Sequence, residues 1–197
     1  MGKIHNVEKM TDNRFVNLYH VDATSVHNTP VSYYVASRAK DVPALKLKTG
    51  RNDPDGVIIY SIYGEKKDKV VLVRQYRYTL GDYIYEFPAG LVEPGEDFHE
   101  GAVREMYEET GLKLEPLKVD PAFEKPYFTT VGMTDESCAT VYGYASGEIS
   151  KACLLYTSSS ASCCTSWQIP MLYVLSSALS AANTLTPPMP TTIVAYS

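Results

Sequence analysis

The feature that most constrains the fold is a helix whose two ends are both marked in the sequence. Asp97 is a favourable N-cap residue, and Glu100, three positions later, completes a capping-box pattern. Gly111 stands where helices commonly end in a left-handed residue. These signals predict a helix from Phe98 to Thr110, with one apolar side that packs against other elements.

The predicted helix is apolar on one side and acidic on the other. Its apolar stripe comprises Phe98, Ala102, Val103 and Met106. Glu105, Glu108 and Glu109 fall elsewhere at positions i, i+3 and i+4, and like charges at this spacing destabilise a helix by roughly 0.2 to 0.5 kcal/mol per pair. Mg2+, which takes oxygen ligands, would offset that repulsion. A solvated acidic surface is the alternative when the glutamates are considered alone.

Runs of apolar and β-branched residues elsewhere predict six strands, and the chain divides into three regions. The predicted strands lie at Phe15–Ala23, Val31–Arg38, Val57–Tyr63, Lys69–Tyr76, Tyr83–Phe87 and Ala139–Ala145. The first two read as an N-terminal hairpin, and the next two are apolar enough to be covered on both faces. We therefore expect an N-terminal β element at 1–50, a main domain at 51–151 and a separate tail at 152–197.

Charge and composition exclude several classes of partner. The formal charge of −5 provides no positive field for nucleic acid or an anionic membrane. The N-terminus resembles no secretory signal, and no window reaches the roughly 18 to 20 apolar residues of a spanning helix, so a cytoplasmic location is expected. The four cysteines, at 138, 153, 163 and 164, form neither a zinc pattern nor a disulfide framework.

The segment 152–197 differs from the rest of the chain. All 18 basic and 23 acidic residues lie at or before Lys151, and Ser, Thr, Ala and Pro dominate thereafter. A disordered or low-complexity appendage and a hydrophobic association segment are two interpretations. The third, which we favour, is translated non-coding DNA, because Cys153–Ser158 resembles the translation of a common sequencing-library adapter.

A longer pattern contains the predicted helix. Gly90 is followed after five residues by Glu96, and after seven more by the run Arg104–Leu112. This spacing resembles the Nudix box at every defined position. The resemblance implies an α/β (α+β) Nudix fold, in which a mixed β-sheet is sandwiched between helices, with an N-terminal β-hairpin element.

The resemblance also implies roles for individual residues. The metal ligands would be the carbonyl of Ala89 and the side chains of Glu105, Glu108 and Glu109, binding Mg2+, or Mn2+ in its place. Arg104 would orient the glutamates, and Glu96 would tie the loop to the helix. Gly90 would permit close backbone approach at the substrate, and Arg77 would contact the substrate.

The segments around the box resemble bacterial ADP-ribose pyrophosphatases. The matching residues are Gln75–Arg77, Glu86–Leu91 and Pro126. This implies hydrolysis of ADP-ribose to AMP and ribose 5-phosphate by a homodimer, with another nucleotide sugar as an alternative substrate. Tyr33 and Tyr34 either offer an aromatic face to adenine or, as we favour, pack within the N-terminal strands.

One departure from the family bears on activity. Members commonly use a glutamate well downstream of the box, but no carboxylate follows Glu148 here, and both Glu136 and Glu148 stand too early. A non-catalytic nucleotide-binding module and a truncated inactive product are therefore alternatives to an active enzyme. The general base and the number of metal ions are left open. His99 is expected to be exposed rather than catalytic.

Overall fold

The chain forms two compact units. The computed structural model describes residues 1–150 and the main chain of 192–196. The first unit comprises Met1–Asp55 and Pro126–Cys138, and the second comprises Gly56–Lys125 with the described residues from Ala139 onward. The first unit thus extends beyond the expected boundary at residue 50 and takes in a short segment from the expected main domain.

The first unit contains a three-stranded antiparallel sheet. Its strands are β1 (Lys3–Lys9), β2 (Asn17–Thr24) and β3 (Pro30–Ser37), in that order. The strands β2 and β3 form the hairpin that the sequence predicts. Strand β1 was not predicted from the sequence, because its side chains are mostly polar and exposed and show no clear alternation. Tyr19 of β2 is fully buried, and its hydroxyl donates to the carbonyl of Ala39 over 2.7 Å.

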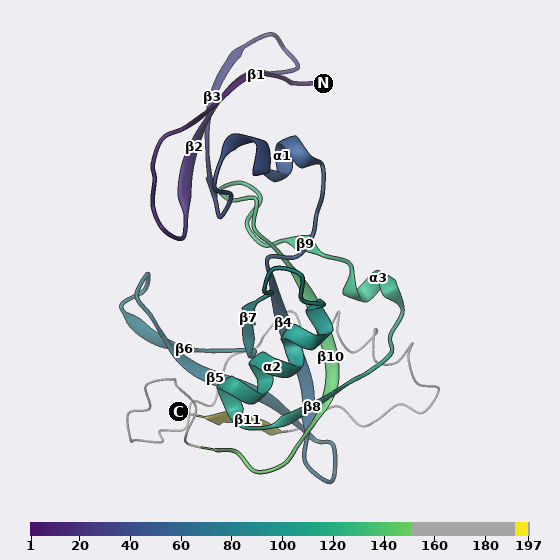
Figure 1. The fold of residues 1–197 in the computed structure, drawn as a ribbon. Helices are drawn as coiled ribbons and strands as arrows, with labels where there is room; N and C mark the ends of the chain where they lie inside the picture. The colour runs from purple at the N-terminus through teal and green to yellow at the C-terminus, as the bar shows by residue number, and fades with distance from the viewer. Residues whose placement is uncertain (151–191, 197) are drawn as a thin grey trace. The chain divides into compact units, whose positions relative to one another are not determined.

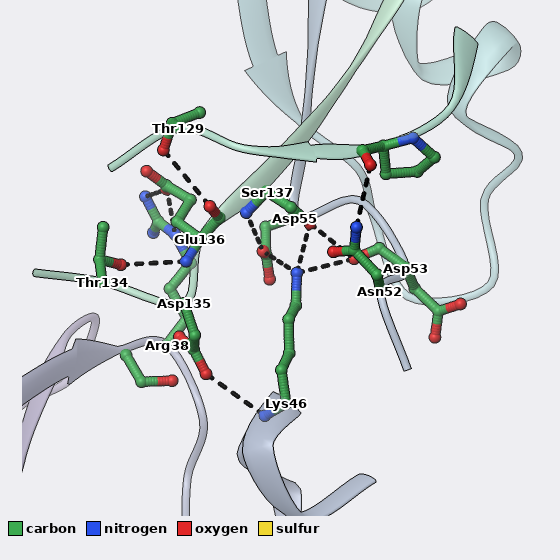
Figure 2. Close-up of polar contacts among 12 residues, drawn as sticks. Arg38, Lys46, Asn52, Asp53, Asp55, Thr129, Thr134, Asp135, Glu136 and Ser137 are labelled. Atoms are coloured by element: carbon green, nitrogen blue, oxygen red, sulfur yellow. Dashed lines mark hydrogen bonds and ion pairs between the residues drawn. The ribbon is translucent and has the colours of Figure 1, made fainter. Parts of the chain in front are cut away.

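A polar cluster joins the two sequence segments of the first unit (Figure 2). A 3-10 turn (Val42–Ala44) leads into the short helix α1 (Lys46–Thr49). The ammonium of Lys46 lies 2.6 Å from Asp55 Oδ2 and also donates to the Ser137 hydroxyl. The Ser137 N–H donates to the same Asp55 oxygen over 2.9 Å, so one carboxylate holds both segments.

The second unit is built on a mixed sheet. Its strands are β4 (Gly56–Tyr63), β5 (Lys69–Arg77), β6 (Asp82–Glu86), β7 (Ala89–Leu91), β8 (Lys113–Pro116), β10 (Ser137–Ser146) and β11 (Thr192–Tyr196). The order along the sheet is β11-β5-β4-β10-β8, with β6 beside β5, β7 beside β4, and β9 (Tyr127–Phe128) beside the start of β10. Strand β11 is parallel to β5, whereas β6 is antiparallel to it, which confirms the expected mixed sheet of an α+β protein.

Helix α2 (Phe98–Thr110) lies across one face of this sheet (Figure 1). Its bounds agree with the sequence prediction, Asp97 caps it by accepting from the His99 N–H, and Gly111 ends it in the left-handed region. Ala102 and Met106 are fully buried in the core beneath it. The prediction for Val103 was wrong: this residue is 38% exposed, because the buried stripe is narrower than the apolar pattern.

The other face of the sheet has its own apolar cluster. Tyr60 and Ile62 of β4 point to this side, as strand alternation requires, and Phe123 of the four-residue helix α3 (Pro121–Glu124) packs against them. Both faces of the central strands are therefore covered, as predicted. Within residues 1–150 and 192–196, however, only α2 is longer than four residues, so a long helix covers one face alone.

Two further expectations concern the uncharged C-terminal segment and membrane-spanning helices. The structure describes residues 1–150 and 192–196. Apart from Thr192–Tyr196, the uncharged segment predicted to be non-native or disordered lies outside them, and three of the four cysteines lie there too. None of the helices that the structure describes is long and apolar enough to cross a membrane.

The burial of α2 generates a stability prediction. Met106→Ala removes a fully buried side chain and should lower the free energy of unfolding by about 2 to 5 kcal/mol, because it leaves a cavity. Val103→Ala on the same helix is the control, and a change below about 1 kcal/mol is expected there. Urea denaturation of both variants measures the difference, and equal losses would contradict the packing described.

Candidate functional site

The candidate site lies where strand β7 passes the middle and the C-terminal end of α2. Strand β7 pairs antiparallel with β4, so that Gly90 stands opposite Val57 and Ala89 opposite Ile58. The loop after β7 turns back into α2, whose Arg104 donates to the carbonyl of Leu91 over 3.0 Å. The strand backbone is thereby fixed against the acidic side of the helix.

Gly90 contacts the Glu105 carboxylate directly. A Cβ atom at Gly90 would lie 1.9 Å from Glu105 Cδ and 2.2 and 2.3 Å from its two oxygens. No real atom tolerates such distances, so any side chain at position 90 would force the carboxylate to move. The absence of a side chain here allows a carboxylate to rest on the strand backbone.

Arg104 is the hub of the site. Its Nε and Nη2 each donate over 2.9 Å to the two oxygens of Glu96, which makes a bidentate pair. Its Nη1 donates to Glu105 over 2.7 Å and more weakly to Glu108 over 3.4 Å. One guanidinium therefore partly neutralises three carboxylates, and the hydrogen bonds of Glu96 and Glu105 raise the pKa of Arg104.

Glu96 holds the loop that enters α2. Besides Arg104, its carboxylate accepts from the Glu93 N–H over 2.8 Å, and these two interactions lower its pKa to about 2. Gly101 gives the carboxylate room, since a Cβ there would lie 3.1 Å from Glu96 Oε2. The loop, the hub and the first turns of α2 are thus connected through one side chain.

Glu109 occupies a different environment from the other glutamates. Its Oε2 accepts from the Ala89 N–H over 3.1 Å. The pKa of Glu109 is raised to about 7, chiefly by burial; the Ala89 hydrogen bond opposes this rise, and the negative charges of Glu105 and Glu86 add to it. This carboxyl is therefore the group in the site that holds a proton near neutral pH.

Arg77 lies at the end of β5 and pairs with Glu86 of β6. Its Nη2 is 2.7 Å from Glu86 Oε1, and its Nε donates to Oε2 over 3.2 Å. The Arg77 side chain is 45% exposed, so the guanidinium also faces solvent. No role was predicted for Glu86 from the sequence. Its place in the strand directly before the Pro88 turn was the available signal, but its pairing and its charge near Glu109 depend on strand register.

The predicted metal ligands are divided among different partners. Glu105 and Glu108 face Arg104, whereas Glu109 faces the Ala89 backbone. Across residues 1–150 and 192–196, no group of three or more His, Cys, Asp or Glu side chains converges closely enough to hold a metal ion in the positions observed. The donors are neighbours on α2, but their hydrogen bonds point them apart.

The expectation that His99 is exposed needs correction. Its ring is only partly exposed and contacts Asp97 on one nitrogen and Glu124 on the other, each over 3.0 Å. The second contact was not predicted from the sequence, because Glu124 lies 25 residues away and is brought to the ring by α3.

A substitution at Gly90 tests the close approach. Gly90→Ala should displace the Glu105 carboxylate and break its 2.7 Å contact with Arg104, visible in a crystal structure of the variant. The free energy of unfolding should fall by only about 1 kcal/mol, because Glu105 is flexible and can turn to solvent. Gly132→Ala, where a Cβ meets nothing within 4 Å, is the matched control. An unmoved Glu105 would refute the interpretation.

The raised pKa of Glu109 generates a pH prediction for the metal-free protein. The folded carboxyl keeps its proton up to about 7, whereas the unfolded one loses it near 4.5. The contribution of this carboxyl to stability is therefore fully present below pH 4.5, and at most about 3 kcal/mol of it is lost as the pH rises through 7. Glu109→Gln should abolish this loss in urea titrations at each pH. Glu108→Gln, at an exposed neighbour, should retain it, and a pH-independent wild type would contradict the assignment.

Comparison with known proteins identifies the family. A model of the NUDIX domain matches residues 53–153, just over half of the chain. The ADP-sugar pyrophosphatase of Mus musculus is 49% identical over 53 residues, which are 27% of this chain and 24% of that protein. The ADP-ribose pyrophosphatase of Bacillus subtilis (strain 168) is 36% identical over 83 residues, 42% of each chain. The chain therefore matches less than half of the length of these relatives.

The fold has a counterpart among solved structures. A crystal structure described as an ADP compounds hydrolase superposes with a TM-score of 0.55 at 20% identity, covering 75% of this chain and 69% of that chain. At this identity the similarity shows the fold alone. Together with the matched domain, the Arg104 hub and the Gly90–Glu105 contact, it leads to one conclusion: the chain belongs to the Nudix family.

Proposed function

We propose that the chain catalyses Mg2+-dependent hydrolysis of the pyrophosphate bond in a nucleoside diphosphate derivative. ADP-ribose is the first candidate, with AMP and ribose 5-phosphate as products. The contact of the Gly90 backbone with the Glu105 carboxylate carries the proposal, because it places a carboxylate directly against the backbone of β7. Relatives named ADP-sugar pyrophosphatase and ADP-ribose pyrophosphatase support the choice of substrate.

The donor set suits a hard cation. Glu105, Glu108, Glu109 and the carbonyl of Ala89 would hold Mg2+, or Mn2+ in its place, because these cations take carboxylate and carbonyl oxygens. The negative charges of Glu105 and Glu86 help to raise the pKa of Glu109, and a bound cation would neutralise part of this negative charge. When bound, such a cation would neutralise charge on the pyrophosphate and lower the pKa of a coordinated water.

The protein side chains would orient these donors and the substrate. Arg104 holds Glu105 on the strand and is itself fixed by the bidentate bond to Glu96, so the hub restricts where the carboxylates can turn. The Arg77 side chain is 45% exposed, and its guanidinium can contact a phosphate oxygen. Its pairing with Glu86 keeps the charge in place beside the box.

The downstream glutamate expected in the family has no equivalent after Glu148. Of the two earlier candidates, Glu136 is paired with Arg38 in the first unit, with Nη2 and Oε1 2.9 Å apart, and Glu148 is exposed in the second. We therefore expect turnover below that of a Nudix enzyme with a complete set of carboxylates.

Incubation with ADP-ribose and Mg2+ tests the function. Release of AMP, abolished by a chelator, is the expected result, and a panel of other nucleotide sugars under the same conditions defines the specificity. Binding of ADP-ribose without AMP release would defeat the proposal in favour of a non-catalytic module. If the protein neither binds ADP-ribose nor releases AMP, it is an inactive product.

We further propose that the chain forms a homodimer that shares the N-terminal β element between copies. A small nucleotide is its only other partner. Light scattering coupled to size-exclusion chromatography measures the mass of the particle. A cytoplasmic location is still a prediction from the sequence.

Glu108→Gln is expected to lower turnover by orders of magnitude while barely changing stability. The side chain is 53% exposed and its contact with Arg104 is long, so its loss costs little, and removal of one like charge relieves repulsion. Steady-state rates and melting temperature in metal-free buffer provide the readouts. Glu115→Gln, at an exposed strand position in the same unit, is the control. A large fall in melting temperature would show that Glu108 is structural.

A further inference from the structure

His99 lies between two carboxylates from different elements. Its Nδ1 is 3.0 Å from Asp97 Oδ1 at the start of α2, and its Nε2 is 3.0 Å from Glu124 Oε1 at the end of α3. The ring also stacks on Phe98, with centroids 4.1 Å apart. It is therefore held on both of its polar edges and on one face.

This geometry depends on the protonation state of the ring. A neutral imidazole has one N–H donor and one acceptor nitrogen, whereas the imidazolium has two donors. An ionised carboxylate only accepts, so a neutral His99 would turn a lone pair towards one of the two oxygens. Both contacts are favourable together only when the ring carries a positive charge.

The surroundings favour the charged ring. Partial burial opposes the charge, but the hydrogen bonds and charges of Glu124 and Asp97 outweigh it and raise the pKa of His99. The Glu124 side chain is only 14% exposed, so little water reaches its carboxylate and the His99 ring takes the place of a water donor. The other nearby charges on these elements are Glu100, Asp120 and Lys125, and neither ring nitrogen bonds to any of them.

We propose that His99 is a pH-sensitive clamp, which in its protonated form joins the first turn of α2 to α3 through Asp97 and Glu124. At the α2 end, Asp97 is the N-cap and directly follows Glu96, the partner of Arg104. At the α3 end, Phe123 packs in the second apolar cluster. Loss of the proton leaves the ring a donor to only one of the two carboxylates, so the link between α2 and α3 is lost.

The direction of the effect follows from the shift. A histidine whose pKa is raised by folding stabilises the folded state fully below 6.5, and this contribution disappears as the pH rises through the folded pKa. The clamp is therefore closed in mildly acidic solution and opens on the alkaline side of 6.5. This behaviour needs neither substrate nor metal, so it can be tested independently of the proposed hydrolysis.

Imidazole NMR of the full chain, recorded from about pH 5 to about pH 9, tests the clamp. His99 should titrate above 6.5, and Glu124→Gln should lower its pKa, while Glu100→Gln, at an exposed neighbour, should leave it unchanged. The remaining histidines, at positions 5, 20 and 27, provide internal references. A His99 pKa at or below 6.5 in the wild type, or no response to Glu124→Gln, would overturn the proposal.

Hydrogen exchange of α3 measures the mechanical consequence. The protection of the Ala122 and Phe123 amides, corrected for intrinsic exchange, should fall roughly twofold to fivefold as the ring loses its proton. His99→Gln should show the low value at every pH, and His99→Lys, which stays charged, the high one. His27→Gln, in an exposed turn, is the matched control. If protection of α3 does not change with pH in the wild type, the clamp does not exist; that result stands even if a variant fails to fold.

Discussion

The site depends on one balance of charge, which is the neutralisation of crowded carboxylates by Arg104. Three glutamates face a single guanidinium, and the bidentate bond to Glu96 fixes the plane of that group. The pairs are partly exposed, so each contributes little to stability by itself. Their value is geometric, because the fixed guanidinium keeps Glu105 on the backbone of Gly90.

Glu109 shows what happens to a carboxyl that Arg104 does not reach. It is buried, has one backbone donor and lies among negative charges, so its pKa rises instead of falling. Two glutamates of the same box, Glu96 and Glu109, therefore have pKa values near 2 and near 7 because of their different partners. A cation entering the site would compete with the proton on Glu109, which links metal affinity to pH.

Polar side chains also hold together parts of the chain that are distant in sequence. In the first unit, Lys46 and Asp55 connect the N-terminal part to Ser137 (Figure 2). In the second unit, His99 connects α2 to α3 in a similar way, but through an imidazole that must be protonated to donate on both sides. The second connection, as proposed, holds only while His99 is protonated.

The sequence by itself determined the features that depend on neighbouring residues. Both ends of α2, the central strands and the grouping of Glu105, Glu108 and Glu109 follow from caps, alternation and helical spacing, which act within a few positions. Only the tertiary structure decided the exposure of Val103, the pairing of Arg77 with Glu86, the contact of His99 with Glu124 and the opposite pKa shifts. These depend on which strand or helix lies opposite a residue and on how much water is removed there, and spacing along the chain contains neither quantity.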